Sequence, residues 1–139
     1  MHPRNLPPFT VIRIPHSFDA GLTYEYKFFV ILGHYDNAAF CIKATSRTAF
    51  YDNNPDKMCG CVCYEALEVD FFRKRTIIEP DNQFEIPHCQ LVVHQDRGAL
   101  EVVGRLADDF GQRLKTAIAN SQTLDRRRRA WLRAALPGY

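Results

Sequence analysis

The stretch that decides the fold runs from Tyr26 to Ser46 and reads YKFFVILGHYDNAAFCIKATS. It holds two apolar runs, Phe28–Leu32 and Ala38–Ile42, on either side of a polar segment, Gly33–Asn37. Short apolar runs that flank a turn-prone segment predict a buried β-hairpin. Polar residues follow the second run, so the hairpin is expected to bring a cation and hydroxyls to its ends. Groups of this kind can bind or cut a phosphodiester.

Length and composition predict one folded domain. The chain has 139 residues, with 46% hydrophobic and 24% charged, which is ordinary for a globular protein and argues against disorder. No apolar run approaches the ~20 residues of a membrane span, and the N-terminus, MHPRNLPPF, lacks the apolar core of a secretory signal. We therefore expect a cytoplasmic protein whose five cysteines are reduced thiols.

The charge is unevenly distributed along the chain. The net charge is only +2, yet residues 122–139 hold five arginines and one aspartate, so the remainder carries a small excess of acidic side chains. This distribution excludes a generally basic nucleic-acid module. Any site for a polyanion must therefore be a local patch.

The segments around the hairpin predict short strands and loops. Residues 1–8, with three prolines, indicate an irregular lead-in, and Phe9–Ile14 indicates a first strand. His16–Glu25 and Thr48–Met58 are rich in turn-forming residues and predict loops, the second long and exposed. Cys59–Leu67 alternates and predicts a further core strand.

The next segments are shorter. Thr76–Ile78 predicts a short strand and Glu79–Ile86 a connection. Pro87 is suited to the first turn of a short helix over His88–Leu91. Ala99–Val103 is compatible with a strand or with part of a helix.

Two helices are predicted near the C-terminus. The first begins at a cap, Asp108 or Asp109, and its apolar residues recur at helical spacing. These residues are Phe110, Leu114, Ala117 and Ile118. The second, Leu124–Leu136, places its arginines around an apolar stripe.

The order of elements, several strands followed by helices, predicts an α+β fold: a small, curled antiparallel barrel or sheet with C-terminal helices. A parallel α/β fold is disfavoured because no helix separates the first strands. We expect a main domain over residues 9–121 and a basic C-terminal helix, within residues 122–139, packed on it.

The triplet Cys59, Cys61 and Cys63 suggests a metal site, because alternate residues of a strand share a face. Zinc sites normally use a C-x-x-C spacing, which lets a turn wrap the ion, whereas alternate residues of a strand hold their sulfurs too far apart for one ion. Buried free cysteine behaves as a small hydrophobe. We therefore favour core cysteines and expect no metal or cofactor. A thiol-based metal or redox site remains the weaker alternative.

Other motifs leave alternatives open. His34 lies in the expected hairpin turn and is either a solvated histidine or a general acid/base. Arg73, Lys74 and Arg75 either present cations to phosphates or keep a strand edge soluble. For Arg126–Arg129 a charged outer face is favoured over contact with RNA or an acidic partner.

Three segments together resemble the PemK/MazF-like toxins of bacterial toxin–antitoxin systems. KFFVILG, Lys27–Gly33, is similar to the family strand usually written RPVVVL, and FCIKATS, Phe40–Ser46, is similar to the strand that follows it. FFRKRTIIEP, Phe71–Pro80, resembles a later family strand of aromatic, charged, hydroxyl and apolar residues. The resemblance covers roughly residues 9–121 and implies an SH3-like barrel that is commonly a dimer.

The resemblance also implies a function. Many members of the family are metal-independent endoribonucleases that cut single-stranded RNA and pair with an antitoxin. The implied catalytic residues are Lys27, Thr45 and Ser46, with His34 as a further candidate acid/base. The implied RNA-binding residues are Lys43, Arg47, Arg73, Lys74 and Arg75.

This chain departs from the family pattern most consequentially at Lys27-Phe28, which stands where the family has Arg-Pro. The long loop over residues 48–58 and the extra helix Leu124–Leu136 also lie outside the common core of the family. Lysine lacks the planar fork that grips a phosphate with two hydrogen bonds. The departure leaves two readings. One is a ribonuclease with an altered grip on its substrate, and the other is a catalytically inactive barrel that binds a protein or nucleic-acid partner.

Overall fold

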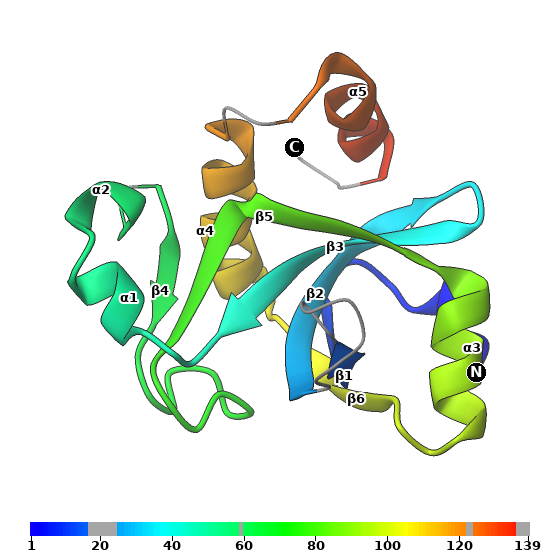
Figure 1. Cartoon of the computed structure of the whole chain (residues 1–139). Helices are drawn as coiled ribbons and strands as arrows, with labels where there is room; N and C mark the ends of the chain where they lie inside the picture. The colour runs from blue at the N-terminus through cyan, green and yellow to red at the C-terminus, as the bar shows by residue number, and fades with distance from the viewer. Residues whose placement is uncertain (17–24, 59, 122–123, 136–139) are drawn as a thin grey trace.

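A six-stranded antiparallel sheet forms the centre of the computed structural model, which describes residues 1–16, 25–58, 60–121 and 124–135 (Figure 1). The strands are β1 Thr10–His16, β2 Glu25–Tyr35, β3 Ala38–Thr45, β4 Val62–Tyr64, β5 Thr76–Pro87 and β6 Glu101–Arg105. The helices are α1 Ala49–Asp52, α2 Pro55–Met58, α3 His88–Asp96, α4 Asp108–Ala119 and α5 Arg126–Ala135, with a 3-10 turn, η1, at Pro3–Asn5. Residues 17–24 of the expected first loop, Cys59, residues 122–123 and the end of the expected last helix, 136–139, lie outside the described residues.

The strands lie in the order β4-β5-β3-β2-β1-β6, and each neighbouring pair is antiparallel. The sheet curls into a half-barrel, with α4 and α5 on one side and α3 at the other (Figure 1). The α+β prediction is therefore confirmed. Within the described part of the chain, no helix is long and apolar enough to cross a membrane.

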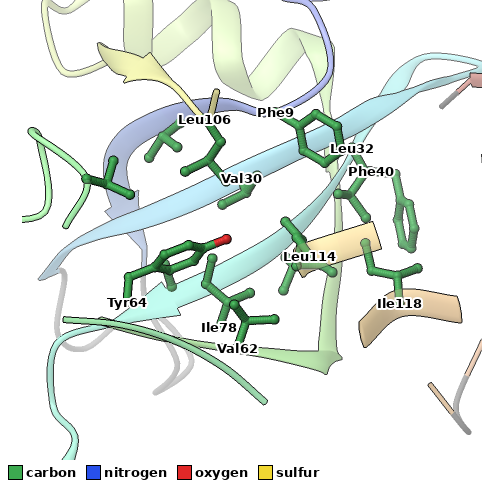
Figure 2. Packing of buried hydrophobic residues seen from close by; sticks show 14 of the residues in the cluster. Phe9, Val30, Leu32, Phe40, Val62, Tyr64, Ile78, Leu106, Leu114 and Ile118 are labelled. Atoms are coloured by element: carbon green, nitrogen blue, oxygen red, sulfur yellow. The ribbon is translucent and has the colours of Figure 1, made fainter. Parts of the chain in front are cut away.

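The sheet is buried on both faces, which explains why its central strands are continuous apolar runs. Successive side chains point to opposite faces: Val30 and Leu32 of β2 enter one core, and Phe29 and Ile31 enter another. Figure 2 shows the first core, which α4 closes with Leu114 and Ile118. The second core is closed by α3 and by the N-terminal segment, whose Leu6 is buried. The expected irregular lead-in thus contributes to the core.

The predicted hairpin is confirmed as β2 and β3, but its turn is shorter than expected. Only Asp36 and Asn37 form the turn, and Asp36 has a positive φ of 52°, which aspartate tolerates better than most residues. Gly33 and His34 belong to β2, and the pairing with β3 shifts register between Ile31 and Gly33. The prediction that His34 lies in the turn is therefore wrong.

The expected connection Glu79–Ile86 is part of strand β5, so that prediction is wrong. The turn-forming residues of this segment produce an irregularity inside the strand. In the pairing of β3 with β5, Ala44 lies opposite Ile78, but Ile42 lies opposite Gln83. Residues 79–82 therefore have no regular partners in β3 and form a bulge. Pro80, which has no N–H to donate, lies in this bulge, as expected for proline within a sheet.

Other elements differ from the expectations mainly in length. The expected loop Thr48–Met58 contains α1 and α2, and the expected strand Cys59–Leu67 is reduced to β4. The ambiguous segment near Ala99–Val103 is a strand, β6, which pairs with β1. Both C-terminal helices form, although Ala107 and not an aspartate occupies the N-cap of α4.

Candidate nucleic-acid interface

The predicted site residues Lys27 and Thr45 lie at one end of the sheet, at the start of β2 and the end of β3. The register pairs Phe28 with Ala44, and one step further along the ladder places Lys27 beside Thr45. Directly opposed residues of an antiparallel pair have Cα atoms roughly 5 Å apart. The fold therefore brings together the cation and the hydroxyl that the resemblance implied.

Lys27 is held by an ion pair. Its ammonium lies 2.7 Å from Oε2 of Glu25, and the side chain is only 13% exposed. The same carboxylate oxygen lies 2.9 Å from Nη2 of Arg47. The hydrogen bonds from Lys27 and Arg47 lower the pKa of Glu25, so this carboxylate stays ionised at neutral pH. Arg47 also donates its backbone N–H to Oγ1 of Thr45, over 3.1 Å.

Lys43 joins the same group of charges. Because side chains alternate along a strand, Lys43 lies on the same face of the sheet as Cys41, which belongs to the second core. Lys27, two residues before Phe29 of that core, lies on this face too. Burial lowers the pKa of Lys43, and the positive charges of Lys27 and Arg47 lower it further. We call Lys27, Lys43, Arg47 and Glu25 the cation cluster.

His16, at the end of β1, belongs to this site although it was not among the predicted site residues. It pairs with Glu25 across β1 and β2, and its ring lies edge-on to Phe29 and Phe84, each with centroids 5.2 Å away. Burial lowers the pKa of His16, and Lys43 and Lys27 lower it further, so its imidazole is neutral at pH 7. Parity along β1 could have identified it, because Ile12, Ile14 and His16 alternate onto one face.

The opposite face of the same sheet end is hollowed by a groove of ≈ 560 Å³. Its lining includes three of the predicted residues, Ser46, Arg73 and Lys74, together with Phe28 and Phe71. Ser46, Arg73 and Lys74 are all exposed. Within the residues that the structure describes, the Arg73 and Lys74 side chains make no ion pair or hydrogen bond. Their charges are therefore available to a ligand of this groove.

Arg75 is placed differently from its neighbours. Its guanidinium donates to both carboxylate oxygens of Asp52, at 2.9 and 3.2 Å, and to Sγ of Cys63 at 3.3 Å. These contacts link the start of β5 to α1 and β4. Arg75 therefore serves the fold, and the solvent-facing cations of the triplet are Arg73 and Lys74.

His34 is not brought to the site. It lies seven residues along β2 from Lys27, which corresponds to roughly 20 Å. Its Nδ1 lies 2.8 Å from Nε2 of His88, and its Nε2 lies 2.7 Å from the carbonyl oxygen of Leu6. Burial lowers the pKa of His88, and the nearby His34, His2 and Arg4 lower it further. This pair joins the N-terminal segment to α3.

The cysteines do not form the expected row in the core. Cys61 and Cys63 are half-exposed, Cys41 is buried and Cys89 is exposed, whereas Cys59 is not among the described residues. The prediction that the triplet is buried is thus wrong for its two described members, because Cys61 precedes β4 and, within β4, Val62 and Tyr64 face the first core while Cys63 lies on the other face. Among the described residues, no group of three or more His, Cys, Asp or Glu side chains could hold a metal ion.

The arginines of α5 are used mainly against the body of the protein. Arg128 reaches Glu85 at 3.0 Å and Gln83 at 3.1 Å, and its guanidinium lies over the Phe40 ring. Arg127 lies over Tyr35, and Arg129 donates to the carbonyl oxygen of Ala119, the last residue of α4. The expectation of a charged outer face is therefore wrong for Arg128 and Arg129, which are half-buried, whereas Arg126 and Arg127 are exposed.

A second groove, of ≈ 940 Å³, lies between α2, β4, β5 and α4. Its carboxylates, Asp56, Glu79, Asp81 and Asp109, outnumber its two cations, Lys57 and Arg113. Arg113 is also paired with Glu68 at 2.9 Å. The acidic lining disfavours a polyanion here, so the end of the sheet with the cation cluster is the better candidate for binding nucleic acid.

Comparison with known proteins gives no family: no family model matches the chain, and no curated protein matches it.

Proposed function

We propose that the chain is a PemK/MazF-like, SH3-like barrel that cuts single-stranded RNA without a metal ion, as a toxin or a toxin-derived endoribonuclease. The observation that carries this proposal is the position of Lys27 beside Thr45, within the cation cluster and next to a neutral His16. The curled antiparallel sheet and its helices are compatible with such a barrel.

The reaction that suits these groups is attack by the 2′-hydroxyl of RNA on the adjacent phosphorus. The neutral imidazole of His16 accepts the proton of the 2′-hydroxyl as the new P–O2′ bond forms. The P–O5′ bond breaks, and the leaving oxygen takes a proton from the ammonium of Lys43, whose lowered pKa favours donation. The products are a 2′,3′-cyclic phosphate and a 5′-hydroxyl, and solvent returns the two side chains to their starting protonation states.

The other residues of the site bind and orient the phosphate. Lys27 stabilises the charge that develops on the phosphorane oxygens. Thr45 is placed to orient the phosphate, and Arg47 to bind a neighbouring one. Glu25 holds Lys27 and Arg47 in position through its two ion pairs.

The test is incubation of purified protein with single-stranded RNA in the presence of EDTA. We expect cleavage by the wild type and loss of cleavage in Lys27→Ala, with Lys27→Arg as the conservative control. Unchanged cleavage by Lys27→Ala contradicts the assignment of the site. Cleavage that requires an added divalent ion contradicts the proposed metal independence.

A second candidate function is that of a catalytically inactive barrel that binds a protein or nucleic-acid partner. The Lys27–Glu25 ion pair favours it, because the carboxylate at 2.7 Å offsets the charge that catalysis needs. This candidate predicts binding of RNA or of a protein partner without cleavage. Expression in bacteria separates the two candidates further, since growth arrest supports the nuclease.

A further inference from the structure

The two faces of the sheet end carry different chemistry. Lys27 faces the cation cluster, whereas its neighbour Tyr26 has the parity of Phe28 and so lies on the face with the groove. Tyr26 is 48% exposed, which is unusual for an aromatic residue in a strand of this sheet. The guanidinium carbon of Arg13, a residue that lines the groove, lies 4.3 Å from the centroid of the Tyr26 ring.

The groove beside Tyr26 has a packed aromatic wall. Phe71 lies against the backbone of β6 at Gly104, where an added Cβ would be 2.5 Å from Cδ1 of Phe71. Phe71 contacts Phe72 edge-on, with centroids 4.9 Å apart, and Phe72 is buried in the first core. Gly104 therefore allows an aromatic ring to line this groove in a fixed position.

The charges of the groove complement a nucleotide. Arg73 and Lys74 are exposed, and they make no side-chain ion pair or hydrogen bond with the described residues. Asp70 and Glu101 also line the groove, and Glu101 lies 3.8 Å from Arg13. A volume of ≈ 560 Å³ is within the usual range for a small-molecule site.

We propose that this groove binds the unpaired nucleobase next to the phosphate at the cation cluster, a subsite that rests on the proposed function. The base stacks on the exposed Tyr26 ring, which adjoins the groove through its contact with Arg13, and Arg73 and Lys74 bind the phosphate that follows it. Stacking on aromatic side chains combined with cations along the backbone is how proteins hold single-stranded RNA. The RNA strand thus crosses the end of the sheet from one face to the other.

The experiment measures binding of a short single-stranded RNA whose riboses are 2′-O-methylated, so that no 2′-hydroxyl can attack. Fluorescence polarisation is measured for the wild type, Tyr26→Ala, Tyr26→Phe and Lys27→Ala. We expect Tyr26→Ala to weaken binding roughly 5- to 150-fold, the usual range for the loss of one stacked base, and Tyr26→Phe to bind like the wild type. Phe50→Ala is the matched control, because Phe50 is similarly exposed, at 54%, but lies on α1, where its ring packs edge-on against Tyr51 and not against a residue of the groove.

A second probe, identical but with one abasic position, isolates the stacking contact. The abasic position is moved along the strand from one probe to the next. When the missing base is the one that Tyr26 holds, we expect the wild type and Tyr26→Ala to bind the probe with equal affinity. Thermal unfolding of each variant checks that it is folded.

The outcomes separate this inference from the proposed function. Loss of binding in Lys27→Ala with unchanged binding in Tyr26→Ala overturns the subsite and leaves the function standing. If Tyr26→Ala weakens the binding of the complete and the abasic probes equally, the subsite is also overturned, because the effect then does not depend on a base. A wild type that neither binds the probe nor cuts unmodified RNA overturns the function and the subsite together.

Discussion

The two ends of β2 both carry polar side chains. At one end, Lys27 lies beside Thr45 and within the cation cluster. At the other end, His34 is hydrogen-bonded to His88 and to the carbonyl oxygen of Leu6. Both ends gather polar side chains from segments far apart in the sequence. At the His34 end these groups join the N-terminal segment to α3, so their hydrogen bonds serve the fold. At the Lys27 end, Glu25 pairs with both Lys27 and Arg47, and Lys43 adds a third positive charge close to them. The comparison teaches that a local excess of charge, and not polarity alone, distinguishes the candidate site.

The largest expected effect compares the two ends directly. Lys27→Ala should reduce RNA cleavage about 100- to 1000-fold, the usual consequence of removing one group that stabilises transition-state charge. His34→Ala should change the rate per folded molecule less than about twofold, because His34 lies roughly 20 Å away. Cleavage rates are measured on both variants after their folded fractions are determined. A His34 variant as defective as the Lys27 variant contradicts the distinction between the two ends.

The second prediction concerns the pH dependence of cleavage. His16 must be neutral to accept a proton, and its pKa is lowered from 6.5. The rate should therefore be independent of this group at neutral pH and fall only as the pH drops below about 6.5. His16→Gln should lower the rate about 100-fold and abolish this acidic limb. An acidic limb that persists in the variant assigns the titration to another group.

The third prediction concerns stability at the other end. Folding lowers the pKa of His88, so the neutral form is favoured in the folded state and the unfolded chain binds protons first. The stabilisation is complete above about pH 6.5 and is lost as the pH falls below it towards the lowered pKa. His88→Ala should cost about 1 kcal/mol through the lost hydrogen bond to His34, and it should weaken the dependence of stability on pH. Urea unfolding at pH 7.5 and pH 5.5 measures both, and an unchanged pH dependence contradicts the assignment to His88.

Half of the candidate site could be predicted from the sequence. The pattern of two apolar runs around a turn predicted the hairpin, and the hairpin fixes Lys27 beside Thr45. His16 was missed because the first strand was expected to end at Ile14 and His16–Glu25 to form a loop, so the alternation of Ile12 and Ile14 was not extended to His16. The distinction between Arg75 and its neighbours depends on Asp52, 23 positions away, and no local pattern indicates that contact.

The fold was predicted less completely at its edges than at its centre. The extent of β5 was missed because turn-forming residues in a bulge are indistinguishable in sequence from those in a connection. The arginines of α5 were expected to face outward because charge alone does not show whether a guanidinium covers an aromatic ring.

The smallest expected effect compares two neighbouring arginines. Arg73→Ala should weaken RNA binding only a few-fold and reduce the dependence of log Kd on log salt by roughly 0.7, as for the loss of one phosphate contact to a single strand. Arg75→Ala should leave RNA affinity unchanged and lower the unfolding temperature, because its partners are Asp52 and Cys63. Salt titrations of RNA binding and thermal unfolding of both variants provide the comparison. Reversed effects contradict the division of roles within the triplet.

The reaction proposed for the cation cluster is tested on one RNA strand that the protein cuts at a defined position, in EDTA. We expect the cut ends to carry a 2′,3′-cyclic phosphate and a 5′-hydroxyl. We also expect that replacing the single 2′-hydroxyl at that position with hydrogen prevents cleavage there. The proposed reaction is contradicted if the products carry a 5′-phosphate or if the 2′-deoxy strand is cut as fast as the original strand. It is also contradicted if the wild-type protein leaves the original strand intact.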